Sequence, residues 1–245
     1  MIYNKITAMS LHRFFLEQHV DKEIIMVKDR PMVHRMKSVL RLRKGDFVSF
    51  FNAYPEGLGF DFLAELKNIE GASAVFMVRE KKENIREPNK KLILFQSLIK
   101  KEKFELVLQQ GTEVGISEFV PVISARSEKK SLQTIRCEKI LREAAEQSGR
   151  AAIPRLHKVV FFEEAIKLAK SFSPRTYFAY ENEKDNMIRG AGDRSFNFFI
   201  GPEGGWEAKE LMAAGHANFE IISLGKLILR AETAAIAGSF TLLWG

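Results

Sequence analysis

Two glycine-rich stretches in the second half of the chain carry the residue types best suited to ligand binding. The first, at 201–205, reads Gly-Pro-Glu-Gly-Gly and directly follows the apolar run 196–200. Glycine lets a ligand approach bare backbone, and Pro202 fixes one backbone angle and removes one donor. A strand that runs into a glycine loop and then a helix is how α/β proteins hold ligands at the carboxyl ends of strands. An ordinary tight turn would show the same pattern.

The second stretch begins with an apolar segment, predicted to be a strand, that ends at Gly225. Residues 224–234 read Leu-Gly-Lys-Leu-Ile-Leu-Arg-Ala-Glu-Thr-Ala and lead into an apolar final helix, predicted over 233–243. Two predicted strands of one domain that each end in a glycine loop indicate a single pocket lined by both loops.

Together these stretches resemble the motifs of the RsmE family, the 16S rRNA uracil-N3 methyltransferases of the SPOUT superfamily. The resemblance rests on GPEGG at 201–205 and on LGxxxLRxETA at 224–234. It extends to EAAEQSGR at 143–150, and in the first part of the chain to RFF at 13–15 and VLRLRKGD at 39–46. The second motif is long and specific, so the pair is a stronger signal than a lone GxGxxG.

The resemblance implies an enzyme, an S-adenosylmethionine-dependent methyltransferase that methylates N3 of a specific uridine in 16S rRNA. It also implies an α/β fold in which a SPOUT-type trefoil-knotted parallel-sheet domain follows an N-terminal PUA-like β-barrel. Hydrophobic periodicity cannot reveal a knot, so the knot is expected from the resemblance alone. Two alternatives stay open: a non-catalytic RNA-binding protein of the same fold, and a SPOUT methyltransferase that acts on another RNA.

The expected S-adenosylmethionine site combines the two glycine stretches with the end of a third predicted strand, 176–181. Backbone groups hold a ligand best where no side chain intervenes. Apolar Ile200, Leu224 and Leu229 are candidates to sandwich the adenine, although such residues more often belong to a core. The predicted cofactor residues are Tyr180, Glu181, Ile200, Gly201, Pro202, Glu203, Gly204, Gly205, Leu224, Gly225, Leu227, Leu229, Thr233 and Ala234.

The implied acceptor nitrogen must lose its proton before or during methyl transfer, so a base or a nearby cation is needed. Arg230 and Glu232, the charged pair of the second motif, are the predicted catalytic residues. Arg230 is expected to orient the uracil or its phosphate. Glu232 is a candidate base, with a structural cap or a partner of Arg230 as alternatives. Leu227 stands where the family usually has arginine, a departure that weakens an RNA or cofactor contact unless Lys226 replaces it.

The charge distribution indicates a polyanionic partner. The net charge is +7 and the pI about 9.4, which suits RNA. Residues 86–158 carry +6, whereas 159–245 carry −2. Lysines crowd the start of a helix predicted over 97–110, where the helix dipole disfavours cations, so an outside partner or a solvated helix start explains them. The predicted RNA contacts are Arg13 and Arg41, together with one basic surface formed by Lys100, Lys101, Lys103, Arg126 and Arg150.

Three regions follow from the patterns along the chain. Short aromatic and β-branched segments over 1–80 indicate a small barrel, which the resemblance identifies as a PUA-like RNA-binding barrel. Residues 81–91 form a charged linker. Over 92–245 strands alternate with helices, which implies a mostly parallel sheet covered on both faces. Further predictions are a helix over 136–148 that ends at Gly149, a strand over 156–161, and unusual hairpin geometry at Asn52-Ala53.

Several classes of protein are excluded. Cys137 is the single cysteine, so neither a disulfide framework nor a cysteine-based metal site is available, and no metal is expected. Neither a signal peptide nor a long apolar span is visible, which predicts a cytoplasmic protein with no membrane partner. The expected partners are 16S rRNA or the small ribosomal subunit, and a second copy of the chain, because the apolar final helix and the resemblance both indicate a homodimer.

Overall fold

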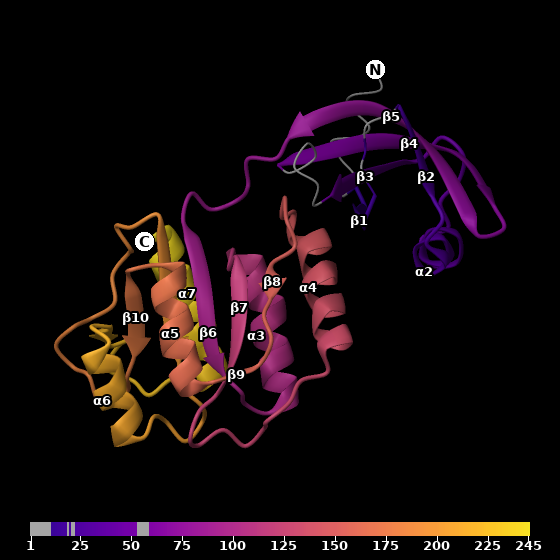
Figure 1. The fold of residues 1–245 in the computed structure, drawn as a ribbon. Coiled ribbons are helices and arrows are strands. Elements are labelled where there is room, and N and C mark those ends of the chain that lie inside the picture. Colours follow the sequence, from indigo (N-terminus) through magenta and orange to yellow (C-terminus); the bar gives the residue numbers. More distant parts are fainter. Residues whose placement is uncertain (1–10, 19, 21–22, 53–58) are drawn as a thin grey trace. The chain divides into compact units, whose positions relative to one another are not determined.

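The computed structural model describes residues 11–18, 20, 23–52 and 59–245. Its contacts divide the chain into two units, of which unit 1 holds residues 1–86 and 149–152 and unit 2 holds residues 87–148 and 153–245 (Figure 1). The short segment 149–152 therefore interrupts unit 2 in sequence and belongs with unit 1. Nothing in the local sequence indicates this, because the segment follows a helix of unit 2.

In the described part of unit 1, five strands form one sheet in the order β1-β3-β4-β5-β2. Strands β1 and β3 pair in parallel and the other neighbours are antiparallel. Aromatic and aliphatic side chains from alternate positions, including Phe14, Phe50 and Phe76, fill the core on one face. The strands are β1 Arg13–Leu16, β2 Ile24–Val27, β3 Phe47–Asn52, β4 Phe60–Glu70 and β5 Ser73–Glu83.

Between β2 and β3 lie a short helix, α2 (Arg30–His34), and a π-helical turn, η1 (Arg35–Val39). Asp29 begins α2 because its side chain accepts a hydrogen bond from the Met32 backbone N–H at 2.6 Å. Shortly after η1, Arg41 has a φ of 53°, a left-handed conformation that is uncommon outside glycine.

Within the described residues, unit 2 contains a parallel sheet in the order β12-β10-β11-β6-β7-β8, with β9 also paired to β7. Parallel pairing agrees with the alternation of strands and helices in the sequence. The strands are β6 Lys91–Ser97, β7 Glu118–Ile123, β8 Arg155–Leu156, β9 Val160–Phe161, β10 Thr176–Ala179, β11 Ser195–Ile200 and β12 Glu220–Ile222.

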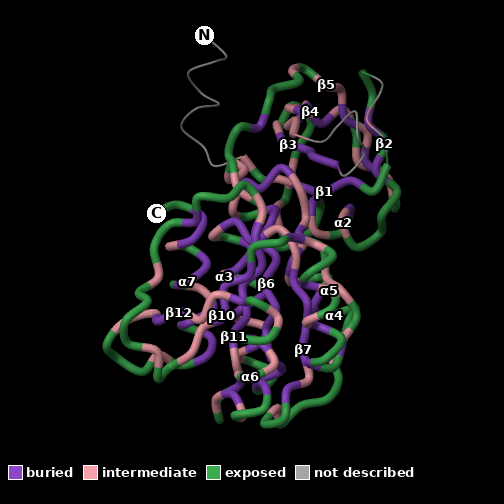
Figure 2. The backbone as a smooth tube through the Cα atoms, turned by 60° about the vertical axis from the view of Figure 1, so that its left-hand side comes forward, coloured by how far each residue is buried: buried purple, intermediate pink, exposed green. Residues whose placement is uncertain are grey.

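Helices cover both faces of this sheet, and the strands between them are buried (Figures 1 and 2). One core lies against α3, α4 and α7 and includes Leu94 and Phe198, whereas the other lies against α5 and α6 and includes Phe95 and Phe199. Neighbouring residues of one strand thus enter opposite cores, as the two-residue repeat of a strand requires. The helices are α3 Lys101–Val114, α4 Thr134–Ser148, α5 Phe162–Phe172, α6 Ala208–His216 and α7 Ala231–Trp244.

Several boundaries differ from the sequence-based prediction. The helix predicted from residue 97 begins at Lys101, because residues up to Ser97 pair with β7 in the sheet. Residues 156–161 do not form one strand, since β8 and β9 pair with different parts of β7. Helix α4 ends as predicted, with Gly149 at a φ of 83°. Strand β5 continues to Glu83, past residue 80. The turn predicted at Asn52-Ala53 falls largely outside the described residues.

Candidate active site

A cavity of about 500 Å³ lies in unit 2 where strands β10, β11 and β12 end and helix α7 begins. The carboxyl ends of parallel strands meet at one edge of a sheet, which brings the two glycine stretches together. All predicted cofactor residues except Thr233 line this cavity, and so does Arg230. Residues that the sequence did not assign to it also contribute, namely Lys103, Ala179, Trp206, Ser223, Ile228 and Ala231.

The first glycine stretch forms a tight turn in which the Gly205 N–H donates to the Pro202 carbonyl at 3.0 Å. Gly205 has a φ of 71°, and a Cβ added to it would lie 2.5 Å from Oε1 of Glu181. Any other residue at position 205 would therefore be strained at this φ, and its Cβ would force the exposed Glu181 side chain to move. Trp206 follows, and its indole N–H donates to the Ala179 carbonyl at 3.0 Å, which ties the turn to the end of β10.

Two side chains, one inside the motif and one outside it, tie the turn to the rest of unit 2. Glu203 accepts a hydrogen bond from the Lys100 backbone N–H at 3.3 Å, at the N-terminus of α3, where the side chain of the N-cap residue Lys100 makes no capping hydrogen bond. Arg126 donates to the Gly204 carbonyl at 2.7 Å. A carboxylate at a helix N-terminus is favourable, so Glu203 stabilises both the helix and the loop. Arg126 and Gly204 are 78 residues apart in the sequence, so no local sequence pattern predicts this hydrogen bond.

The second glycine stretch leads into α7. Gly225 has a φ of 134°, and after it Leu227 and Ile228 lie on the cavity rim with 81% and 86% of their surface exposed. Thr233 and Ala234 both follow the helix start, but only Ala234 lines the cavity. Successive residues of an α-helix point about 100° apart, so adjacent positions face different neighbours.

A charged pair lies beside the cavity at the start of α7. Glu232 is buried, with 8% of its surface exposed, and its carboxylate lies 3.1 Å from Nζ of Lys103 on α3. Burial alone would raise the pKa of Glu232, but a hydrogen bond from its own backbone N–H, the hydrogen bond from Lys103 and the charges of Lys103 and Arg230 outweigh this, so its pKa lies below the usual value. Glu232 does not line the cavity, whereas Lys103 and the exposed Arg230 do.

The predicted basic surface is only partly assembled. Lys100 and Lys101 are exposed at the start of α3, whereas Lys103 turns to the cavity and Arg126 to the glycine loop. Arg150 belongs to unit 1 and has only 5% of its surface exposed, so little of its side chain is open to a phosphate. Its RNA contact stays a prediction.

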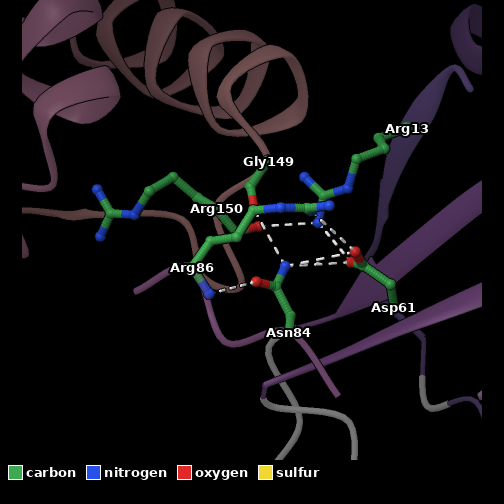
Figure 3. A network of polar contacts seen from close by, with 6 residues as sticks. All are labelled: Arg13, Asp61, Asn84, Arg86, Gly149 and Arg150. Carbon is green, nitrogen blue, oxygen red and sulfur yellow. Dashed lines mark hydrogen bonds and ion pairs between the residues drawn. The ribbon is translucent and has the colours of Figure 1, made fainter. Parts of the chain in front are cut away.

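Arg13, a predicted RNA contact, lies instead in a polar network of unit 1 (Figure 3). It forms an ion pair with Asp61 at 2.5 Å, donates to the Arg150 carbonyl at 3.0 Å and lies 4.3 Å from the centre of the Phe51 ring. Asn84 joins the network by donating to the Gly149 carbonyl at 3.0 Å. The Arg13 side chain is 9% exposed, so little of it is open to a ligand. Arg41, the other predicted contact in this unit, is exposed.

These features define a class of protein. A parallel α/β domain with a half-apolar cavity at the carboxyl ends of its strands is typical of enzymes that bind a nucleotide-like ligand. Within the part of the chain that the structure describes, no group of three His, Cys, Asp or Glu side chains is arranged to hold a metal ion. No helix in that part is long and apolar enough to cross a membrane.

Comparison with known proteins identifies the family. Residues 86–242 match the family described as RNA methyltransferase domain. The chain is 33% identical over 211 residues to ribosomal RNA small subunit methyltransferase E of Rickettsia conorii, covering 83% of each chain. The crystal structure of the protein of that name from Neisseria gonorrhoeae, bound to S-adenosyl methionine, superimposes with a TM-score of 0.84 at 28% identity, covering 94% of this chain and 95% of the other.

The chain therefore belongs to the RNA methyltransferase domain family and, within it, to the ribosomal RNA small subunit methyltransferase E family. This confirms the family resemblance read from the two motifs.

Proposed function

We propose that this protein transfers the methyl group of S-adenosylmethionine to N3 of a specific uridine in 16S rRNA. The observation that carries the proposal is the cavity, which both glycine stretches line in a chain that belongs to a ribosomal RNA methyltransferase family. The crystal structure of the relative from Neisseria gonorrhoeae holds S-adenosyl methionine. A cavity of about 500 Å³ is within the range of roughly 300–1,000 Å³ typical of small-ligand sites.

The residues present fit S-adenosylmethionine. Gly201, Gly204 and Gly205 offer backbone without side chains, and the space that a Cβ at Gly205 would occupy opens toward Glu181. A carboxylate suits the sulfonium cation, and apolar Ile200, Leu224 and Leu229 suit the adenine. When bound, the cofactor supplies the methyl group. The other residues predicted to bind the cofactor keep that role. Thr233 does not line the cavity, so its proposed contribution is to the first turn of α7, which borders the cavity.

The acceptor side of the reaction is assigned to the cations at the cavity. Arg230 is exposed, lines the cavity and forms no ion pair among the described residues, so its guanidinium is available to the uracil or its phosphate. Glu232 is reassigned from candidate base to partner of a lysine. A carboxylate with a lowered pKa that is already paired with Lys103 has little tendency to accept the N3 proton.

The finer fold belongs to the same proposal: a PUA-like barrel in unit 1 and a trefoil knot in unit 2. Support for the knot comes from the segment between β10 and β11. Its Ile188 N–H donates to the Ser223 carbonyl at 2.8 Å, and its Ala191 N–H donates to the Leu242 carbonyl at 3.2 Å. The segment is thus bonded to the chain both before and within α7, as a loop that surrounds a threaded C-terminus would be.

The proposed partners are 16S rRNA or the small ribosomal subunit and a second copy of the chain, in the cytoplasm. Lys100 and Lys101 on unit 2 and Arg41 on unit 1 are exposed cations for phosphate contacts. Helix α7 supports the homodimer, because two large apolar side chains of this apolar helix, Phe240 and Trp244, keep 55% and 53% of their surface exposed. A monomer in light scattering at micromolar concentration would contradict the dimer.

The experiment that tests the proposed activity follows a labelled methyl group. The protein is incubated with tritiated S-adenosylmethionine and small-subunit rRNA from cells that lack the gene, and the modified nucleotide is mapped by mass spectrometry. We expect one N3-methyluridine per rRNA. If the label is found at another atom or in another RNA, the proposed substrate is wrong. Binding of rRNA without methyl transfer would favour the non-catalytic alternative.

A further inference from the structure

Lys103 differs from the other lysines at the start of α3. Lys100 and Lys101 are exposed to solvent, but Lys103 lines the cavity and keeps only 29% of its side chain exposed. It lies next to Phe104, which is buried in the core between α3 and α7. A lysine held this close to an apolar core loses side-chain entropy and hydration. A surface lysine can bind phosphate without this loss, so the position of Lys103 indicates a different role.

Glu232 fixes the position of this ammonium group. Its two carboxylate oxygens lie 3.1 and 3.3 Å from Nζ of Lys103. A lysine ammonium has three N–H donors. Glu232 satisfies at most two of them, and among the described residues no other acceptor bonds to Nζ. At least one donor therefore remains for a ligand in the cavity.

We propose that Lys103, positioned by Glu232, donates a hydrogen bond to the uracil and stabilises the negative charge that the base acquires when N3 gives its proton to solvent. The N3 lone pair then takes up the methyl group, and the S–CH3 bond that breaks leaves its electron pair on the sulfur, which becomes a neutral thioether. This rests on the function proposed above. A donor fixed in advance where charge develops lowers the barrier without reorganisation during the reaction. Lys103 is then a catalytic residue that contacts the substrate, and Glu232 is a positioning residue.

The charges around Lys103 favour this role. Glu232 and Arg230 face it from the start of α7, and Glu203 and Glu181 belong to the other walls of the cavity. The lowered pKa of Glu232 keeps the carboxylate charged, so the ammonium stays in place throughout the neutral range. The two cations suit an anionic base, whereas the carboxylates suit the cationic sulfonium of the donor.

The test compares the wild type with Lys103→Met, Lys103→Arg and Glu232→Gln. Lys139→Met is the matched control, because Lys139 is also a helical lysine paired with a glutamate, at 3.7 Å from Glu143, but it is exposed and does not line the cavity. Single-turnover methyl transfer is measured against pH, and calorimetry gives the affinity for S-adenosylmethionine. Thermal unfolding shows whether the buried Glu232→Gln change affects the fold.

For Lys103→Met we expect the rate to fall about 100-fold near neutral pH, as for loss of one such donor. The defect should shrink as pH rises, because the uridine then ionises unaided. Affinity for S-adenosylmethionine should be unchanged, Lys103→Arg should keep more activity because it can still pair with Glu232, and Glu232→Gln should be intermediate. If Lys103→Met lowers only the affinity for S-adenosylmethionine, at a normal rate, Lys103 binds the carboxylate of the cofactor. If it changes only the salt dependence of RNA binding, making the slope smaller, Lys103 binds a phosphate. Either result overturns the proposal.

A binding measurement separates this proposal from the proposed function. Small-subunit rRNA made with 5-fluorouridine, whose N3 is more acidic, is compared with unmodified rRNA in the presence of S-adenosylhomocysteine, which allows no transfer. The wild type should bind the fluorinated RNA more tightly as pH rises, and Lys103→Met should lose this preference. If the wild type transfers no methyl group, the proposed function fails, but the preference for fluorinated RNA still tests the role of Lys103. If the wild type and Lys103→Met prefer the fluorinated RNA equally, the proposed role of Lys103 is overturned.

Discussion

Charged side chains serve opposite purposes in the polar network of unit 1 and in the cavity of unit 2. In the network, Arg13 is almost buried, and Asp61, the Arg150 carbonyl and the Phe51 ring surround it (Figure 3). In the cavity, Arg230 is exposed and forms no ion pair among the described residues. The fold depends on the partners of a paired, dehydrated arginine, because removing one leaves a buried charge uncompensated, whereas an exposed, unpaired arginine is available to a ligand. The residue type is therefore no guide to the role until its surroundings are known.

The largest expected effect comes from closing the cavity itself. Gly205→Val should lower affinity for S-adenosylmethionine by at least about 100-fold, roughly 2.8 kcal/mol, because valine is strained at a φ of 71° and would displace Glu181. Gly204→Val should be milder, since a Cβ there meets Arg126 at an ordinary 3.4 Å. Calorimetry measures both, with Gly192→Val as a control in open space. Equal affinity in all variants would remove this loop from the site.

The second effect tests the open arginine. Arg230→Ala should lower kcat about 100-fold with little change in the affinity for either ligand, since an interaction made only in the transition state reduces kcat and kcat/KM together. Arg230→Lys should stay impaired where a planar fork is needed. Steady-state kinetics measures both, with Arg189→Ala, an exposed arginine away from the cavity, as the control. A raised KM at near-normal kcat would make Arg230 a binding contact only.

The third effect tests Arg13, the nearly buried and paired arginine of unit 1. Asp61→Ala should reduce the free energy of unfolding by about 3 kcal/mol, because it leaves the nearly buried Arg13 without its carboxylate. Urea denaturation measures the loss, and affinity for S-adenosylmethionine should be unchanged. Glu143→Ala removes the partner of the exposed Lys139 and should change stability by less than about 0.5 kcal/mol. Loss of cofactor affinity at normal stability would mean that the network serves the site.

The smallest effect asks whether pairing, rather than location, separates the two uses. Glu118 belongs to unit 2 but is paired, with Lys91 and His157 each at 2.5 Å. Burial alone would raise its pKa, but the hydrogen bonds and charges of these two neighbours lower it further, so its pKa lies below the usual value. A lowered pKa contributes stability above the unfolded-state pKa, and this contribution is lost as pH falls through the folded-state pKa.

Glu118→Gln should therefore reduce stability at neutral pH, by less than Asp61→Ala, and should flatten the decline of the unfolding free energy below about pH 4.3, the usual glutamate value. Urea denaturation at several pH values measures this decline. Methyl transfer should be unaffected. If the unfolding free energy of Glu118→Gln declines at low pH as steeply as that of the wild type, the ion pairs of Glu118 contribute nothing to stability.

Local sequence was sufficient wherever short-range chain geometry decides. The turn at 201–205 and the left-handed Gly149 follow from residues whose allowed backbone angles are known in advance. The parallel sheet follows from the alternation of strand and helix patterns. Because parallel strands end at one edge, the sequence also predicted which segments meet around the cavity. Their chemical roles remain predictions.

Contacts between distant parts of the chain were decided only by the tertiary structure. Lys103 and Glu232 are 129 residues apart, and Arg126 reaches Gly204 across 78. Neither pair leaves a signal in periodicity, because a side chain's partner depends on how the helices pack and not on its own neighbours. For the same reason Arg13 and Arg150, identical in type to Arg230, lie buried in unit 1. The sequence determined the backbone that a ligand can approach, and packing determined which charges stay free to act on it.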